Sequence, residues 1–142
     1  MIKFTLRPAK DDDLDFLDWL NTKCMKERVE KVMDWQVDLF RDTFEPRNVR
    51  IVLVDDFPVG MLKVQIDHDS VYLGDVMVAP DYQNRGLGSQ LVAQVVTEAV
   101  ALNLPVRLRV LKSNPAKELY QRLGFEIIKN DEFYCWMEKA AS

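Results

Sequence analysis

A polar turn with two glycines carries the residues best suited to chemistry in this sequence. It spans residues 80–89, after a β-like stretch at 71–78 and before an apolar-periodic helix. The first backbone N–H groups of a helix lack an intrahelical acceptor, and the peptide dipoles place partial positive charge there. Gly86 and Gly88 have no Cβ and let a ligand approach the main chain. The turn therefore predicts a site for an anion such as a phosphate or pyrophosphate.

Two well-known phosphate motifs do not fit this turn. A P-loop needs Lys followed by Ser or Thr after its second glycine, whereas Gly88 is followed by Ser89 and Gln90. A Rossmann fingerprint needs a third glycine at the position where Leu91 stands. An ATPase and a dehydrogenase are therefore disfavoured. A Gly-x-Gly turn on its own is also typical of a tight connection between a strand and a helix.

The elements that position the turn follow from the hydrophobic pattern. Strands are expected at 2–7, 49–54, 58–66, 71–78, 105–111, 125–128 and 133–138. Helices are expected from 11 to 20 with a break at Asn21 and Thr22, and then at 26–44, 87–103 and 114–124. A helix-length crossover joins the strand at 71–78 to the strand at 105–111, so these two strands must be parallel. The turn then lies at the carboxyl end of a strand, where open α/β sheets bind ligands.

Size and charge narrow the class of protein. A chain of 142 residues is expected to form a single domain, 1–142, with a core that needs no disulfide or metal. The net charge of −4 and the pI near 5.0 argue against a nucleic-acid partner, because binding phosphates needs clustered Lys and Arg.

Metal binding and membrane insertion are not indicated either. Cys24 and Cys135 are far apart and are accompanied by a single histidine, His68, so no zinc site and no disulfide framework is predicted. The sequence has no signal-peptide pattern and no apolar run of 18 residues. We therefore expect a cytoplasmic protein with no membrane partner.

The turn and a second stretch together resemble the GNAT superfamily, the Gcn5-related N-acetyltransferases. Residues 83–88, Gln-Asn-Arg-Gly-Leu-Gly, are similar to the family signature Gln/Arg-x-x-Gly-x-Gly/Ala. Residues 114–125 resemble the family stretch Asn-x-x-Ala-x-x-x-Tyr-x-x-x-Gly-Phe, with a difference of one residue between Asn and Ala. The resemblance implies an α+β fold of three α/β layers, whose mixed, mostly antiparallel sheet has about seven strands with a parallel central pair, and about four helices.

The resemblance also implies an acetyl-CoA-dependent N-acetyltransferase that works by direct transfer to a primary amine, without a metal. Backbone N–H groups of the turn are expected to hold the pyrophosphate, and the pantetheine arm is expected to pair with the strand before it. A backbone N–H near Val76 or Met77 would polarise the thioester carbonyl. The residues expected to bind the cofactor are Met77, Val78, Gln83, Asn84, Arg85, Gly86, Leu87, Gly88, Ser89 and Asn114.

Two side chains are expected to move protons. The family match points to Tyr120, whose phenol (reference pKa ~10) can protonate a departing thiolate (~8.5); a packing role in the core is the alternative. An acceptor amine with a pKa of ~10.4 must lose a proton before it attacks, and Asp75 is the candidate base. Some family members carry a glutamate on the fifth strand, but the matching position here is Arg109.

The acceptor has no diagnostic motif. Glu30, Asp34, Trp35 and Asp38 form either a site for a cationic amine or simply a solvated helix face. A small-molecule or peptide amine is expected, and a homodimer is left open. The alternative to an enzyme is a non-catalytic acyl-CoA-binding or interaction domain with the same fold.

Overall fold

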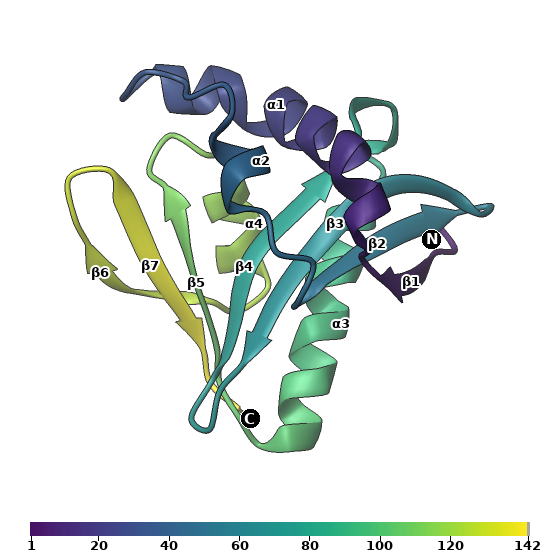
Figure 1. Ribbon diagram of the computed structural model, residues 1–142. Helices are drawn as coiled ribbons and strands as arrows, with labels where there is room; N and C mark the ends of the chain where they lie inside the picture. Colours follow the sequence, from purple (N-terminus) through teal and green to yellow (C-terminus); the bar gives the residue numbers. More distant parts are fainter. Residues whose placement is uncertain (142) are drawn as a thin grey trace. The chain divides into compact units, whose positions relative to one another are not determined.

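The computed structural model describes residues 1–141, whose seven strands form one sheet in the order β1-β2-β3-β4-β5-β7-β6 (Figure 1). The strands are β1 (Thr5–Pro8), β2 (Val49–Val54), β3 (Phe57–Ile66), β4 (Val71–Val78), β5 (Val106–Leu111), β6 (Glu126–Asn130) and β7 (Tyr134–Lys139). The α-helices in this range are α1 (Leu14–Glu30), α2 (Leu39–Thr43), α3 (Leu87–Leu102) and α4 (Ala116–Arg122). The expected mixed sheet and its four helices are confirmed.

The strand pairings explain why the sheet is mixed. β1 pairs with β2 and β2 with β3 in antiparallel fashion, and β5 and β6 both lie antiparallel to β7. β4 and β5 are parallel, with Val71 opposite Val106 and Tyr72 opposite Arg107. The helix α3 connects these two strands, as the length of the crossover predicted.

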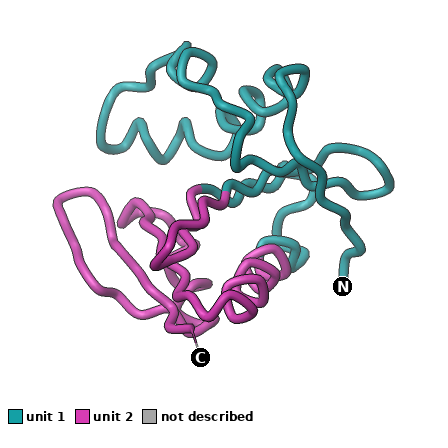
Figure 2. The backbone as a smooth tube through the Cα atoms, turned by 60° about the horizontal axis from the view of Figure 1, so that its bottom comes forward, with its two compact units in different colours: residues 1–63, 75–88 teal, residues 64–74, 89–142 magenta. Residues whose placement is uncertain are grey.

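The chain divides into two compact units, coloured in Figure 2. The first unit comprises Met1–Lys63 and Asp75–Gly88, and the second comprises Val64–Gly74 and the chain from Ser89 onwards. One cluster of buried residues in the first unit consists of Ala9, Leu17, Leu20, Val49, Ile51, Met61, Met77 and Ala79. These apolar residues come from α1, from β2 to β4 and from the segments next to them, so the end of β4 is anchored in this core.

Helix α1 continues through Asn21 and Thr22, so the predicted break is wrong. The Thr22 hydroxyl donates to the Asp18 carbonyl at 2.9 Å, which satisfies this polar side chain inside the helix. Leu17 and Leu20 are fully buried. An unbroken helix places Cys24 on the same stripe, four residues after Leu20.

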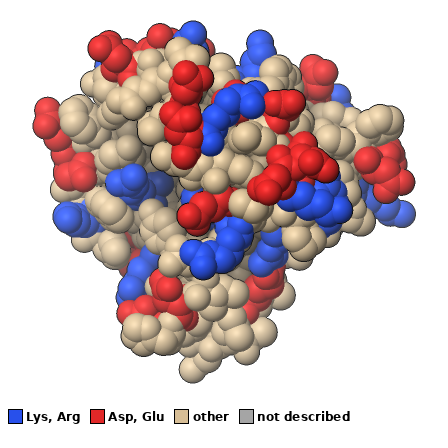
Figure 3. All heavy atoms as spheres, in the orientation of Figure 1, with Lys and Arg blue, Asp and Glu red and all other residues tan. Residues whose placement is uncertain are grey.

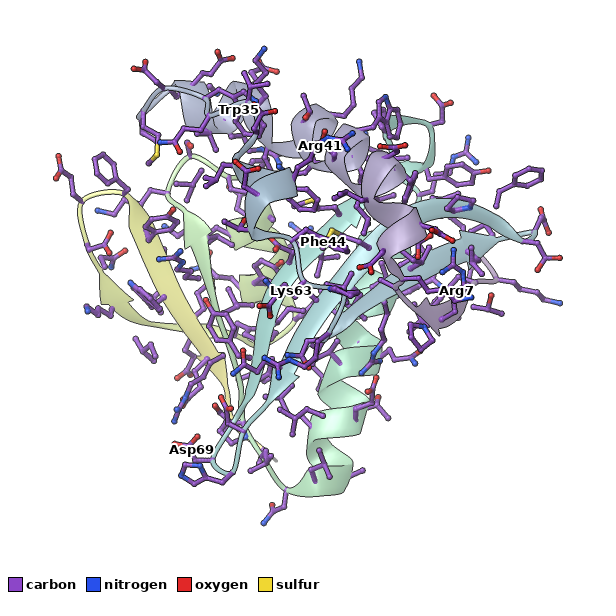
Figure 4. All side chains as sticks on the ribbon, in the orientation of Figure 1. Arg7, Trp35, Arg41, Phe44, Lys63 and Asp69 are labelled. Atoms are coloured by element: carbon purple, nitrogen blue, oxygen red, sulfur yellow. The ribbon has the colours of Figure 1, made fainter. Side chains whose placement is uncertain are left out.

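The predicted helix over 26–44 is also wrong in its extent. α1 ends at Glu30, and the N–H groups of Val32 and Met33 both donate to the Val29 carbonyl just beyond it. Met33 is 45% exposed, so the predicted apolar stripe does not form a continuous core face. Only the short α2 follows, and Arg41 ties it to α1 through Asp15 and Asp18 (Figure 4).

Alternating burial defines the two faces of β5 and β7 in the second unit. Leu108, Val110, Cys135 and Met137 are buried. The residues between them point to the opposite face, which we call the outer face, and they are Arg107, Arg109, Tyr134, Trp136 and Glu138. The outer face is therefore the less buried side of this pair of strands.

Candidate functional site

The start of α3 differs chemically from the start of α1. The first turn of α3 carries no acidic residue, whereas α1 follows Asp11–Asp13 and has Asp15 in its first turn. The Asp13 carboxylate also accepts the Lys10 N–H at 2.8 Å and two bonds from Arg7 at 2.8 and 2.9 Å. These contacts, with the Arg7 guanidinium first, lower the pKa of Asp13. The positive end of α1 is thus matched by its own carboxylates, whereas no acidic side chain in the first turn of α3 offsets the dipole of that helix.

The backbone of residues 83–88, which we call the glycine turn, is built for close approach. Asn84 has φ 62° and Gly86 has φ 84°, so two left-handed residues flank Arg85. A Cβ added at Gly86 or at Gly88 would meet no atom within 4 Å, so open space lies in front of both residues. The guanidinium of Arg85 lies over the Tyr82 ring, 5.4 Å from its centroid. The turn therefore presents main-chain atoms and one cation to a ligand.

Hydrogen bonds connect the glycine turn to the end of β4. The side-chain amide of Gln83 donates to the Val78 carbonyl at 2.8 Å, and the Cys24 thiol donates to the same oxygen at 3.4 Å. Burial raises the pKa of the Cys24 thiol, which keeps it protonated and able to donate at neutral pH. The backbone N–H of Gln83 donates to the Pro80 carbonyl at 3.2 Å. The Gln83 side chain therefore fixes the turn relative to β4.

The strand β4 is also fixed at Met77, one residue before Val78, because β3 approaches it closely there. A Cβ added at Gly60 of β3 would lie 2.5 Å from the Met77 carbonyl oxygen, so only glycine fits there. The Ala79 N–H donates to the Val59 carbonyl at 2.7 Å. Met77 and Val78 are buried, with exposures of 4% and 9%. The backbone at the end of β4 is consequently held on the β3 side.

Two candidate residues of the second unit, Asn114 and Tyr120, lie at and within α4. The Asn114 side-chain oxygen accepts the Ala116 N–H at 2.9 Å, at the start of this helix. Tyr120 is 7% exposed, and its ring contacts the edge of Phe125 at 5.6 Å between centroids. Gly124, with φ 98°, turns the chain so that the Phe125 N–H reaches the Tyr120 carbonyl at 3.0 Å. Tyr120 is thus held rigidly at the end of α4.

The predicted residues divide between the two units. Asp75, Met77, Val78 and the glycine turn belong to the first unit, where hydrogen bonds bring Val78 and Gln83 together. Ser89, the third residue of α3, belongs to the second unit with Asn114 and Tyr120.

Two contributors to the site were not assigned a role from the sequence. Cys24 could have been found from the apolar spacing with Leu17 and Leu20, but the break expected at Asn21 hid it. Gly60 lies inside a strand pattern, which is itself a signal of close backbone approach.

The described part of the chain shows neither a metal cluster nor a membrane-spanning helix. Within residues 1–141, no group of three or more His, Cys, Asp or Glu side chains is placed to hold a metal ion. None of the helices in that part of the chain combines the length and the apolar character needed to cross a bilayer.

Comparison with known protein sequences identifies a family and a curated relative. The sequence model of the acetyltransferase (GNAT) family matches residues 14–125. A curated relative from Arabidopsis thaliana, "GCN5-related N-acetyltransferase 2, chloroplastic", is 32% identical over 69 residues, which are 48% of this chain and 26% of that protein. The chain thus matches only about a quarter of the length of this relative.

Solved structures share the fold over the whole chain. The PaiA N-acetyltransferase from Thermoplasma acidophilum, solved in complex with coenzyme A, has a TM-score of 0.81 at 16% identity and covers 98% of this chain and 99% of its own. The ribosomal-protein-S18-alanine N-acetyltransferase from Escherichia coli has a TM-score of 0.75 at 20% identity, with 99% and 95% covered. With sequence identities of 16% and 20%, these two structures show that the fold is shared.

Proposed function

Because this chain belongs to the acetyltransferase (GNAT) family, we propose that it transfers the acetyl group of acetyl-CoA directly to a primary amine, with residues 1–142 acting as one acyltransferase domain. The observation that carries the proposal is the glycine turn. Its left-handed Asn84 and Gly86, and the open space in front of Gly86 and Gly88, precede a helix start without acidic residues. This combination suits a pyrophosphate.

Each residue of the glycine turn has a part in holding the donor. The backbone N–H groups of residues Asn84 to Ser89, with that of Leu87 among them, bind the pyrophosphate. The Ser89 hydroxyl adds a hydrogen bond. Arg85 supplies a positive charge beside it. Gln83 acts by holding the Val78 carbonyl, because its amide is engaged there at 2.8 Å.

The end of β4 orients the thioester. In this proposal the pantetheine arm pairs with backbone at Met77 and Val78, and Asn114 contacts the same arm. A backbone N–H near Val76 or Met77 then polarises the carbonyl that the amine attacks. Gly60 supports this arrangement, since it lets β3 approach the Met77 carbonyl and hold the strand. Acetyl-CoA itself supplies the acyl group in an activated thioester.

Proton transfer accompanies the exchange of bonds. The amine nitrogen forms a bond to the acetyl carbon while the carbon–sulfur bond breaks. Asp75, directly or through a water, takes the proton that the amine loses, and the Tyr120 hydroxyl gives a proton to the departing thiolate. The burial of Tyr120 and its contact with Phe125 support this role, because they hold the phenol in one orientation.

The experiment that tests the proposal follows free thiol release from acetyl-CoA with a panel of amines. The panel comprises a polyamine, an aminoglycoside, free amino acids and short peptides with a free N-terminus. Acceptor-dependent thiol release, with a matching gain of 42 Da on the acceptor, supports the enzyme. Binding of acetyl-CoA without transfer to any of these amines would contradict it.

Replacement of Tyr120 by Phe tests the proton donor. Tyr120→Phe should lower kcat by about 100-fold, the lower range for general acid catalysis. It should leave the affinity for acetyl-CoA nearly unchanged, because the ring and its contact with Phe125 remain. An unchanged kcat would remove the role assigned to Tyr120.

A non-catalytic acyl-CoA-binding or interaction domain is the second candidate. The observation in its favour is Arg109, which stands on β5 where some family members carry an acid. Such a domain would bind acetyl-CoA with the glycine turn intact and release no thiol. The small-molecule or peptide amine acceptor, the cytoplasmic location and a possible homodimer stay predictions, and fractionation and sedimentation can check the last two.

A further inference from the structure

A pocket of about 350 Å³ opens on the second unit, and the residues that line it all belong to that unit. They come from the turn between β3 and β4 and from the strands beside it, and Figure 4 shows Asp69 at the tip of this turn. Proteins bind small molecules in pockets of roughly 300–1,000 Å³. The pocket is therefore large enough to hold a small ligand.

Ser70 is a buried polar residue in the lining of this pocket. It is only 5% exposed, yet within residues 1–141 its hydroxyl has no hydrogen-bond partner. No fully enclosed side-chain oxygen of the described residues lacks a partner, so the small accessible part of Ser70 includes its Oγ. Because Ser70 lines the pocket, this hydroxyl opens into it. A buried hydroxyl without a partner is a group that a polar ligand can satisfy.

Two carboxylates, those of Asp67 and Asp69, line the pocket from the same turn as Ser70. The Asp67 N–H donates to the Ser70 carbonyl at 2.9 Å and closes this turn. Among the described residues, the Asp67 carboxylate accepts only from the side-chain amide of Gln65, at 3.3 Å. An ionised carboxylate has about four acceptor positions, so Asp67 can accept further hydrogen bonds from a ligand.

Arg107 is the one cation among the lining residues, and it is already paired. Its Nε donates to Glu138 at 2.7 Å, and a terminal nitrogen lies 3.9 Å from Asp69. These carboxylates raise the pKa of Arg107, with the Glu138 hydrogen bond as the largest cause. Because Glu138 offsets the charge of Arg107, Asp67 and Asp69 leave the turn side of the pocket negative.

Trp136 of β7 and Ile128 of β6 line the pocket on the side away from the turn. β5 separates β4 from β7 in the sheet, so these two residues lie across β5 from the acids. Ile128 is 56% exposed, and the Trp136 ring adds an aromatic surface beside it. This side of the pocket therefore suits an apolar group.

Two cations lie close to the Trp136 ring outside the pocket lining. The Arg109 guanidinium is 5.5 Å and the Lys129 amine 5.6 Å from the ring centroid. The Asp131 carboxylate, which accepts from Trp136 Nε1 at 3.5 Å, offsets one of these charges. Figure 3 shows acidic and basic side chains next to one another on this face. A ligand cation is consequently favoured at the turn and disfavoured beside Trp136.

We propose that this pocket binds a small amine with one cationic group and an apolar body. The ammonium group lies at Asp67, Asp69 and Ser70, and the apolar body lies against Trp136 and Ile128. An ammonium has three N–H donors and no acceptor, so it can donate to both carboxylates and to the hydroxyl together. The proposal concerns binding alone and does not depend on acetyl transfer.

The test titrates the isotope-labelled full chain, without acetyl-CoA, with hexylamine, hexanol and hexamethylenediamine. NMR follows the indole N–H of Trp136, identified by its absence in Trp136→Phe, and the backbone N–H of Ser70. Hexylamine should shift both signals and bind about tenfold more tightly than hexanol, because only the ammonium pairs with the carboxylates. Hexamethylenediamine should bind less tightly than hexylamine, because its second ammonium lies near Arg109 and Lys129.

Substitutions in the turn separate ligand binding from general damage. The double variant Asp67→Asn with Asp69→Asn should bind hexylamine no more tightly than hexanol. Ser70→Ala should weaken hexylamine binding about threefold and leave the free energy of unfolding unchanged or slightly higher, because the hydroxyl has no partner to lose. Glu132→Gln, at an exposed acid in the turn between β6 and β7, is the matched control and should keep the wild-type affinity.

Two results would overturn this proposal. One is equal affinity of the wild type for hexylamine and hexanol, and the other is the same loss of affinity in Glu132→Gln as in the double variant. Binding of hexamethylenediamine as tight as that of hexylamine would contradict the orientation of the ligand. None of these results bears on acetyl transfer, because the pocket is tested without acetyl-CoA.

Discussion

The glycine turn and the outer face of β5 and β7 are two contrasting kinds of surface. The glycine turn presents main-chain N–H groups and depends on residues with no Cβ or with φ near 60–85°. The outer face presents side chains, with Arg109 oriented by Tyr134 and Trp136. A surface of main-chain atoms depends on the backbone conformation of residues such as Gly86, whereas a surface of side chains changes with single substitutions.

The largest expected effect is a loss of stability, caused by one methyl group added to β3 where it packs against β4. Gly60→Ala places a Cβ 2.5 Å from the Met77 carbonyl oxygen, and both strands must move. We expect a loss of about 2 kcal/mol in the free energy of unfolding, measured by urea denaturation. The substitution Arg109→Lys on the outer face should lower the free energy of unfolding far less. Equal losses would show that the backbone of β4 has no special constraint.

A second pair of substitutions separates ligand approach from backbone strain. Gly88 has no positive φ, so Gly88→Ala should preserve or slightly raise stability while its methyl group enters the open space before the turn. We expect about a tenfold weaker affinity for acetyl-CoA, measured by calorimetry. Gly86→Ala should instead lose about 1 kcal/mol of stability, because φ is 84° there. Unchanged acetyl-CoA affinity in Gly88→Ala would contradict the pyrophosphate assignment.

The shared Val78 carbonyl predicts coupling between two side chains. Gln83→Ala and Cys24→Ala each remove one donor to this oxygen, and the remaining donor still satisfies it. Each single change should cost about 1 kcal/mol in the free energy of unfolding, and the double variant should lose more than the sum. Strict additivity in urea denaturation would show that the two bonds act independently.

The smallest effect is a pH dependence in the alkaline range. The folded pKa of Cys24 is raised by burial, so its neutral thiol adds stability that is complete below the unfolded pKa of ~8.5. That contribution is lost as the pH rises through the higher folded pKa. The Cys24→Ala variant should lack this part of the decline when unfolding is measured from pH 7 to 11. Parallel curves for both proteins would exclude the effect.

The sequence carries more local signals for the glycine turn than for the outer face of β5 and β7, for a physical reason. Gly86, Gly88 and the β-α crossover have local signatures, because φ restrictions and crossover length act over a few residues. The orientation of Arg109 depends on Tyr134 and Trp136, about 25 residues away and brought opposite by sheet register. No spacing rule connects such residues before the register is known.

The helices show the same limit. The polar pair Asn21 and Thr22 suggested a break, yet the hydroxyl of Thr22 is satisfied within α1. The apolar spacing through Met33 suggested a continuous helix, yet the chain leaves the helix after Glu30. Local propensity and periodicity are weak where tertiary contacts decide the boundary.

The central claim is that the glycine turn binds acetyl-CoA, and one set of initial-rate measurements tests it most directly. Acetyl-CoA and an amine acceptor that supports thiol release are varied together for the wild type and Gly88→Ala. We predict that Gly88→Ala raises the KM for acetyl-CoA about tenfold and leaves the KM for the amine unchanged. A change of both KM values, or no acetyl transfer by the wild type, would contradict the account.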